Sequence, residues 1–148
     1  MNEGIVLTKI DYRGIAEVTL NRPERNNAYN GEMISELIKS FTSLYKNNDV
    51  RIVLIRGLGK HFQGGADLEW LKEIGKLNEQ ENIEVSRNTA SAIKGLTEFP
   101  KPTIAMIHGG CFGGGTGIAA AADIVIASED AIFSIAEAKW GVMAGIII

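Results

Sequence analysis

The spacing of apolar residues divides the chain into short strands and amphipathic helices. Residues 5–12 and 15–20 have strand character and are joined by a short Arg-Gly turn, so they predict an antiparallel hairpin. Between residues 31 and 45 the apolar positions recur every three or four residues, which predicts a helix of about four turns with one buried face. Residues 51–56 place four aliphatic residues between two arginines and predict a buried strand.

A glycine-rich loop at residues 57–65 follows this strand and leads to a short helix that begins near Asp67. A longer polar helix is predicted over residues 79–98, where two prolines end it. We expect the inward face of this longer helix to consist of its spaced apolar residues, which are Ile83, Ala90, Ile93 and Leu96.

The remaining segments repeat the order of strand, loop and helix. Residues 103–107 predict a strand, residues 116–122 a helix of small residues, and residues 124–127 a further strand. Parallel βαβ units, right-handed by default, are the arrangement that this order favours. We therefore interpret residues 1–148 as a single α/β domain with no internal linker or repeat.

Charge and composition exclude several classes of protein. The chain has 15 basic and 18 acidic residues and a formal net charge of −3, which argues against a nucleic-acid partner. No apolar stretch approaches the roughly 18 residues of a membrane span, and the N-terminus lacks a secretory signal, so we expect a cytoplasmic protein with no membrane partner. The single cysteine, Cys111, excludes an internal disulfide, and no His or Cys spacing predicts a metal site.

The charged residues are also unevenly distributed along the chain. Residues 101–148 contain only six of them, so we expect this part to be mostly interior. Asp123 lies within it, and we interpret it as a buried carboxylate that accepts hydrogen bonds from backbone N–H groups.

Two segments place glycines directly between a strand and a helix, at residues 63–67 and 113–116. Helix N-termini expose unpaired N–H groups, and glycine allows another atom to approach them closely. Two such ends that face one point could hold a developing oxyanion, each donor contributing about 3–4 kcal/mol. Tight turning or close packing would explain either loop alone equally well. A phosphate site is weakly supported, because no Gly-x-Gly-x-x-Gly occurs and no lysine follows Gly115.

Glu137 is the acid whose surroundings suit proton transfer. It lies in a mostly apolar segment, residues 133–140, and a desolvated carboxyl group can act as a proton shuttle. From the local sequence alone, a surface glutamate near a loop is the favoured interpretation, with Lys139 as a candidate partner.

Five motifs occur in order along the chain: Leu20-Asn21-Arg22-Pro23 with Asn27-Ala28, Phe62-x-Gly64-Gly65-Ala66-Asp67-Leu68, Lys101-Pro102-Thr103-Ile104-Ala105 with His108-Gly109, Phe112-Gly113-Gly114-Gly115 with Ala122-Asp123, and Phe133-x-x-x-Glu137. Together they resemble the crotonase (enoyl-CoA hydratase/isomerase) superfamily over essentially the whole chain. The resemblance implies an α/β fold built as a right-handed spiral of ββα units, and an acyl-CoA thioester as substrate, its carbonyl held between two backbone N–H groups.

The resemblance also implies roles for particular residues. The backbone N–H donors would be Ala66 and Gly114, and Glu137 would be the catalytic acid/base, which reverses the local preference for a surface role. Coenzyme A is part of the substrate, so no separate cofactor is implied, and Arg25 would lie near its phosphates. The implied substrate-binding residues are Arg25, Ala28, Gly64, Asp67, Leu68, Glu69 and Gly117.

One departure from the family pattern affects the reaction. Hydratases of the family commonly have a second glutamate at the position of Gly117, and hydration divides its proton transfers between two carboxylates. A single carboxylate suffices more easily for moving a double bond. We take an enoyl-CoA hydratase type of enzyme as the leading hypothesis, with an enoyl-CoA isomerase and a non-catalytic acyl-CoA-binding fragment as alternatives.

A second departure is length. Members of the family continue well beyond the position of Glu137 into helices that cover the acyl pocket and build a trimer or a dimer of trimers. This chain ends shortly afterwards, at three isoleucines. We therefore expect a truncated core that lacks the C-terminal helical region, and a homo-oligomer in full-length form.

Overall fold

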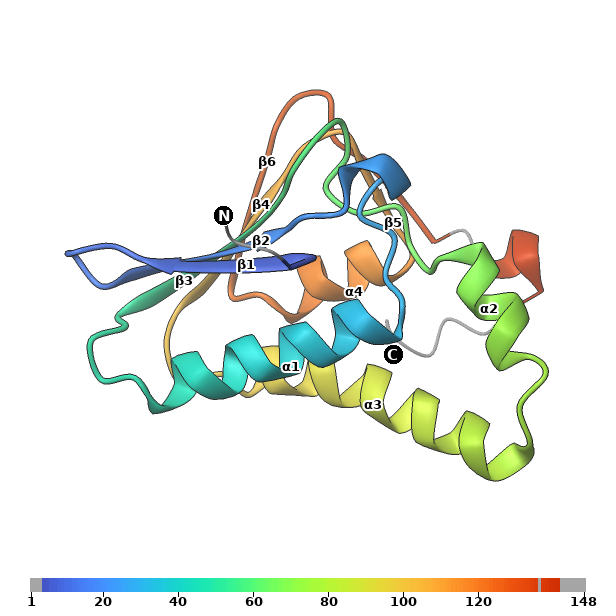
Figure 1. Ribbon diagram of the computed structural model, residues 1–148. Helices are drawn as coiled ribbons and strands as arrows, with labels where there is room; N and C mark the ends of the chain where they lie inside the picture. The colour runs from blue at the N-terminus through green and yellow to red at the C-terminus, as the bar shows by residue number, and fades with distance from the viewer. Residues whose placement is uncertain (1–3, 136, 142–148) are drawn as a thin grey trace.

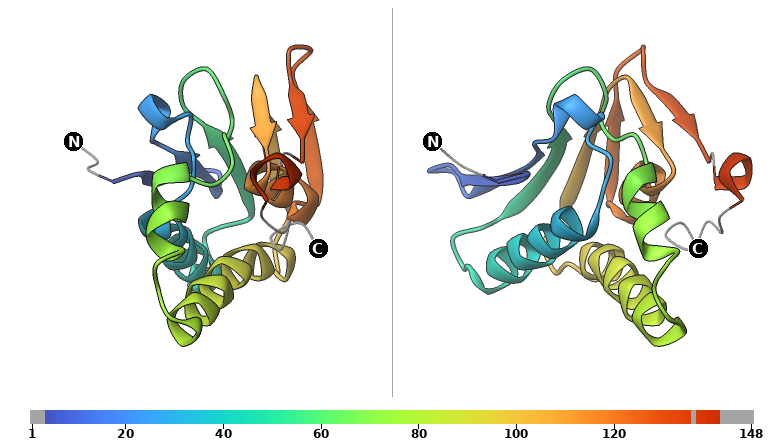
Figure 2. Two further views of the ribbon diagram at one scale, coloured as in Figure 1. Left: turned by 90° about the vertical axis from the view of Figure 1, so that its right-hand side faces the viewer. Right: turned by 45° about the vertical axis from the view of Figure 1, so that its right-hand side comes forward.

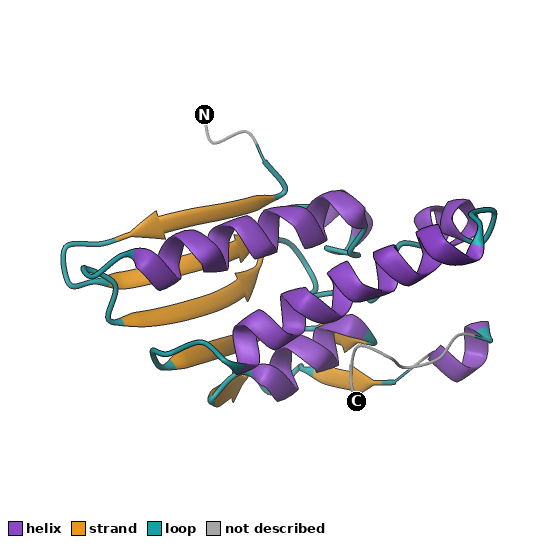
Figure 3. Ribbon diagram, turned by 90° about the horizontal axis from the view of Figure 1, so that it is seen from below, coloured by secondary structure: helices purple, strands orange, loops and turns teal. Residues whose placement is uncertain are grey.

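The computed structural model describes residues 4–135 and 137–141 and consists of a twisted sheet with helices packed against one of its faces (Figure 1). The view from below shows the helices in front of the strands (Figure 3). The two further views show the strands fanning out above the helices (Figure 2). None of the helices in the described part is long and apolar enough to cross a membrane.

The main sheet has five strands in the order β1-β2-β3-β4-β6. The predicted hairpin is confirmed, because β1 (Val6–Ile10) and β2 (Ile15–Leu20) pair antiparallel. Parallel pairing then joins β2 to β3 (Ile52–Gly57), β3 to β4 (Thr103–Ile107) and β4 to β6 (Ile124–Ala127).

A second, two-stranded sheet pairs β5 (Gly110–Phe112) with β7 (Ile132–Ser134) in parallel. The chain passes from the main sheet to this small sheet and back, first through β4, β5 and a helix, and then through β6 and β7. This is the right-handed spiral of ββα units that the resemblance implied. Neither short strand was predicted from the sequence.

Helices connect the strands, namely η1 (Pro23–Arg25), α1 (Gly31–Lys46), α2 (Leu68–Ile74), α3 (Glu79–Thr97), α4 (Gly114–Ala121) and η2 (Glu137–Trp140). Of these, α1, α3 and α4 lie on one face of the main sheet (Figure 1). The predicted helices α1 and α3 are confirmed. The side chain of Asn30 caps α1 by accepting a hydrogen bond from the N–H of Met33. Helix α4 begins two residues before the predicted boundary, inside the run of glycines.

The hydrophobic core lies between the main sheet and helices α1 and α3. In the register of the sheet, Val18 pairs with Ile55, which pairs with Ala105, and all three are fully buried. Phe41 of α1 packs against Phe99, which follows the end of α3, at a ring-centroid distance of 6.0 Å. This contact connects the two helices. The core thus supports the parallel strands whose C-terminal ends lead into the glycine-rich loops.

Two expectations about burial are wrong. In α3, Leu96 is buried and Ile93 is half-buried, but Ile83 and Ala90 are exposed, because the first half of the helix extends beyond the core. Residues 123–135, expected to be interior, are mostly exposed. Asp123 is exposed as well, although its carboxylate accepts hydrogen bonds from the N–H and hydroxyl of Thr103.

Candidate active site

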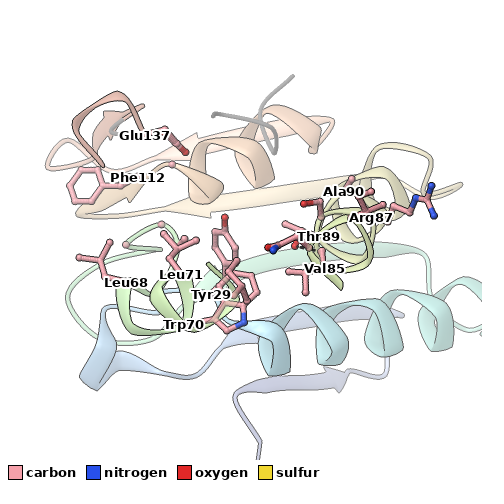
Figure 4. Close-up of a pocket in the computed structure, with 18 of the residues that line it drawn as sticks. Tyr29, Leu68, Trp70, Leu71, Val85, Arg87, Thr89, Ala90, Phe112 and Glu137 are labelled. Carbon is pink, nitrogen blue, oxygen red and sulfur yellow. Dashed lines mark hydrogen bonds between the residues drawn. The ribbon is translucent and has the colours of Figure 1, made fainter. Parts of the chain in front are cut away.

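A cavity of about 760 Å³ lies where the two glycine-rich loops meet helices α2 and α3 (Figure 4). Its walls are mainly apolar and aromatic, and α3 adds several polar side chains. Ile83 and Ala90 line this cavity, which explains why they are not part of the core. Among the side chains labelled in Figure 4 are Tyr29, Leu68, Trp70, Leu71, Phe112 and Glu137.

The two glycine-rich loops run parallel and in register. Gln63 bridges to Cys111, and the N–H of Phe112 donates to the carbonyl of Gln63 at 2.9 Å. Further along, Gly65 and Gly113 both have positive φ, and a Cβ on Gly113 would lie only 3.6 Å from the Cα of Gly65. A residue with a Cβ atom would be strained at either position, so the close approach of the two loops depends on glycine.

Ala66 and Gly114 directly follow these two contacting glycines. Neither of their N–H groups donates a hydrogen bond to any residue in the described part of the chain. Ala66 lines the cavity, whereas Gly114 is buried at the first turn of α4, next to Gly113, which lines it. Unpaired N–H groups, one of them at a helix N-terminus, are the kind of donor that stabilises a negatively charged oxygen. That the N–H groups of Ala66 and Gly114 converge on one point stays a prediction.

Glu137 lies at the same end of the cavity. A Cβ on Gly113 would approach its Oε1 to 2.6 Å, so the carboxylate rests directly over that glycine. Its Oε2 is buried and has no hydrogen-bond partner among the described residues. The side chain is thus half-buried against Gly113 and does not have the surface role that the local sequence favoured. Within the described residues it forms no ion pair with Lys139 either.

Asp67 is a buried acid whose oxygens are occupied by the protein. Its Oδ2 lies 2.6 Å from Nη1 of Arg22, and its Oδ1 accepts the backbone N–H groups of Glu69 and Trp70 at the start of α2. Burial opposes ionisation, but the hydrogen bonds and the charge of Arg22 hold the pKa of Asp67 below its usual value. Arg22 also donates to the carbonyl of Ala28, so this pair fixes the loop before α1 against α2.

Asn27 completes the connection between these loops. Its side chain is fully buried, donates to the carbonyls of Leu58, His61 and Phe62, and accepts the N–H of Arg22. The residue also adopts a left-handed φ of 55°. This amide therefore holds the loop of residues 22–28 next to the glycine-rich loop that carries Ala66.

Comparison with known proteins identifies the family. The family model described as enoyl-CoA hydratase/isomerase matches residues 11–148. The chain belongs to this family. It is 34% identical to a peroxisomal Delta(3,5)-Delta(2,4)-dienoyl-CoA isomerase from Arabidopsis thaliana, covering 94% of this chain and 53% of the relative. It is also 34% identical to a hydroxycinnamoyl-CoA hydratase-lyase from Pseudomonas fluorescens, covering 91% of this chain and 50% of the relative.

A solved structure of an enoyl-CoA hydratase from Shewanella pealeana has the same fold, with a TM-score of 0.94 at 33% identity. The alignment covers 99% of this chain and 55% of that one. The chain spans about half the length of the curated relatives it matches. Their names include both hydratases and isomerases, so membership of the enoyl-CoA hydratase/isomerase family does not by itself select the reaction.

The other predicted substrate-binding residues lie in three places. Gly64 and Leu68 line the cavity, together with Ala66. Arg25 of η1 and Glu69 of α2 form an exposed ion pair, with Nη2 of Arg25 3.0 Å from Oε2 of Glu69. Gly117, at the position of the second glutamate of many family hydratases, is buried within α4 and does not line the cavity. A direct contact of these residues with substrate stays a prediction.

Sequence reasoning missed the aromatic side of the site. Tyr29, Trp70 and Phe112 line the cavity, and the sequence analysis assigned a role to none of them. Burial and the nearby charge of Glu137 raise the pKa of Tyr29 to about 12, so its hydroxyl stays protonated. The signal in the sequence was the place of Tyr29, directly after the Asn27-Ala28 motif.

Proposed function

We propose that this chain carries the catalytic core of an acyl-CoA enzyme of the enoyl-CoA hydratase type. The observation that supports it most is the in-register pairing of the two glycine-rich loops. It leaves the N–H groups of Ala66 and Gly114 without partners in the described structure, beside the carboxylate of Glu137. The 33–36% identity to named hydratases and isomerases agrees with this proposal.

In the proposed reaction, the thioester carbonyl oxygen accepts hydrogen bonds from Ala66 and Gly114. When water adds at C3, negative charge develops on that oxygen, and each fixed N–H group stabilises it by about 3–4 kcal/mol. Glu137 takes a proton from the attacking water and delivers one to C2, so that a water molecule is added in total and the carboxylate is regenerated. The apolar walls of the cavity strengthen these interactions by excluding bulk water.

Coenzyme A enters this proposal as part of the substrate, with no further cofactor. It would lie along residues 22–28 and 66–69, where Arg25 is the exposed cation. The phosphates would then compete with Glu69 for the guanidinium group of Arg25. Assembly into a trimer or a dimer of trimers also remains part of the proposal for the whole protein.

An enoyl-CoA double-bond isomerase is the second candidate. The observation that favours it is Gly117, which leaves Glu137 as the only carboxylate that lines the described cavity near the glycine-rich loops. Moving a double bond needs one group that carries a proton between two carbons, and no activated water. The similarity to dienoyl-CoA isomerases is consistent with this candidate.

The two reactions are separated by incubating the purified protein with 2-enoyl-CoA and, separately, with 3-enoyl-CoA. The hydratase proposal requires 3-hydroxyacyl-CoA from the 2-enoyl thioester, while interconversion without hydrated product supports the isomerase. Glu137→Gln should lower turnover by about 100-fold or more. Glu129→Gln, an exposed acid that does not line the cavity, is the matched control and should not change it. Tight acyl-CoA binding without any turnover would support a non-catalytic binding role.

A further inference from the structure

Tyr29 is fixed directly beside the candidate oxyanion donor. Its N–H donates to the carbonyl of Gly65 at 2.9 Å, and its carbonyl accepts the N–H of Asp67 at 2.9 Å. These two bonds form an isolated parallel bridge with Ala66. The backbone of Tyr29 therefore cannot move relative to the N–H of Ala66 without breaking both hydrogen bonds.

The ring of Tyr29 is held as firmly as its backbone. It meets Trp70 in an edge-to-face arrangement, with ring centroids 5.7 Å apart and an interplanar angle of 68°. Figure 4 shows the hydroxyl directed away from Trp70 and across the cavity, toward the side on which Phe112 and Glu137 lie. Among the described residues, the hydroxyl has no hydrogen-bond partner.

Tyr29 and Glu137 present complementary groups to one cavity. Tyr29 offers a donor without an acceptor, and Oε2 of Glu137 is an acceptor without a donor among the described residues. Buried polar groups are nearly always paired, so the buried, unpaired Oε2 of Glu137 points to a ligand in this cavity. The hydroxyl of the half-buried Tyr29 opens into the same cavity and can donate to that ligand. The raised pKa of Tyr29 keeps its hydroxyl a donor at neutral pH.

We infer that Tyr29 is a further substrate-contacting residue, whose hydroxyl donates a hydrogen bond to the oxygen at C3 of the acyl group. This inference rests on the proposed hydratase function. The oxygen belongs to the attacking water in hydration and to the 3-hydroxyl in the product. As the O–C3 bond forms, the water O–H bond breaks and its proton goes to Glu137. Tyr29 keeps its own proton throughout and orients the oxygen, a task for which Gly117 offers no side chain.

Tyr29→Phe tests this inference, because it removes only the hydroxyl. We expect hydration of a 2-enoyl-CoA to slow by about 10- to 100-fold, through kcat more than KM. The variant should also exchange the C2 hydrogens of a saturated acyl-CoA with D2O, and NMR measures the rate of this exchange. We expect that rate to stay within about threefold of the rate of the parent protein, because exchange needs Glu137 and the oxyanion donors but no oxygen at C3. Tyr12→Phe, at the hairpin turn and 97% exposed, is the matched control and should change neither rate. Equal losses in both rates, or unchanged hydration, would overturn the inference.

A binding experiment decides the inference even if no hydration occurs. The Kd values of a 3-hydroxyacyl-CoA and the saturated acyl-CoA of the same length are compared by calorimetry. We expect the protein to prefer the hydroxylated ligand about three- to tenfold, and Tyr29→Phe to abolish this preference. A preference that survives in Tyr29→Phe, or none in the parent protein, would contradict the role of Tyr29. Absence of hydrated product, with the preference present, would instead contradict only the proposed reaction.

Discussion

Asp67 and Arg22 show how individual side chains set the geometry of the site without facing the cavity. Their side chains are 7% and 15% exposed, and their contact joins the loop of residues 22–28 to the N-terminus of α2. Because Ala66 immediately precedes Asp67, the same contact restrains the candidate oxyanion donor. Asp67 belongs to a motif that suggested a substrate-binding residue. In the described structure, the contacts of its side chain are instead with other residues of the protein.

Replacing Asp67 with Asn tests this role, since Asn can still cap α2 but cannot neutralise Arg22. We expect the free energy of unfolding to fall by about 2–3 kcal/mol near neutral pH. The pKa of Asp67 is lowered by folding, so its contribution is complete above the ordinary value of 3.8 and is lost as the pH falls through the folded value. The difference in free energy of unfolding between the parent protein and Asp67→Asn, measured by urea unfolding, should therefore be smaller at about pH 3.5 than near pH 7.

The exposed pair of Arg25 and Glu69 supplies the control for that measurement. Glu69 is 68% exposed and Arg25 is 49% exposed, so Glu69→Gln should change the free energy of unfolding by less than about 0.5 kcal/mol at either pH. A loss for Asp67→Asn that is equally small, or that grows as the pH falls, would show that the buried pair does not stabilise the fold as described.

At the scale of elements, helix α3 serves two purposes along its length. Its second half packs against α1 through Ala92 and Leu96, whereas its first half extends beyond the core and lines the cavity. The periodicity that predicted the helix is the same in both halves. It cannot distinguish a face that packs against a core from one that borders a cavity, so Ile83 and Ala90 were assigned to the wrong environment.

Gly95 is a weak position near the end of α3, because glycine costs a helix about 0.5–1 kcal/mol relative to alanine. A Cβ added at Gly95 meets no atom within 4 Å. Gly95→Ala should therefore raise the free energy of unfolding by about 0.5–1 kcal/mol, measured by urea unfolding. Gly115→Ala in α4 is the contrasting helical glycine, because its Cβ would lie 3.1 Å from the Cβ and 3.2 Å from the carbonyl oxygen of Gln63. We expect that variant to lose stability, and a gain in it would refute the packing argument.

The sequence predicted the long elements and the two glycine-rich loops, but not the short strands. Gly110-Cys111-Phe112 carries no strand pattern of its own. It becomes β5 only because Gln63 and β7 pair with it across the fold. The same limit applies to Tyr29, whose neighbour Ala66 is far away in sequence. Residues whose role depends on pairing between distant loops cannot be recognised from local spacing alone.

At the scale of the whole molecule, the apolar residues divide between a closed core and an open edge. Strand β6 is the last strand of the main sheet, and its Ile124, Val125 and Ile126 are 50%, 43% and 55% exposed. On β7, Ile132 and Phe133 are 62% and 48% exposed. Low charge in residues 101–148 predicted an interior, and the segment is apolar enough for one. Its first part, through α4, is buried as expected, but no described element covers β6 and β7. Amino-acid composition shows that a surface is apolar and does not show whether a partner covers it.

An uncovered apolar edge strand favours association between molecules, because its backbone N–H and C=O groups can pair with a second chain. We expect the 148-residue chain to associate with rising concentration, as measured by sedimentation velocity. Val125→Lys places a charge in the middle of β6 and should shift the protein toward monomer. Tyr12→Lys adds the same charge at the hairpin turn, where the side chain is 97% exposed, and should leave association unchanged. A chain that stays monomeric at all concentrations, or equal effects of the two lysines, would show that this edge does not drive assembly.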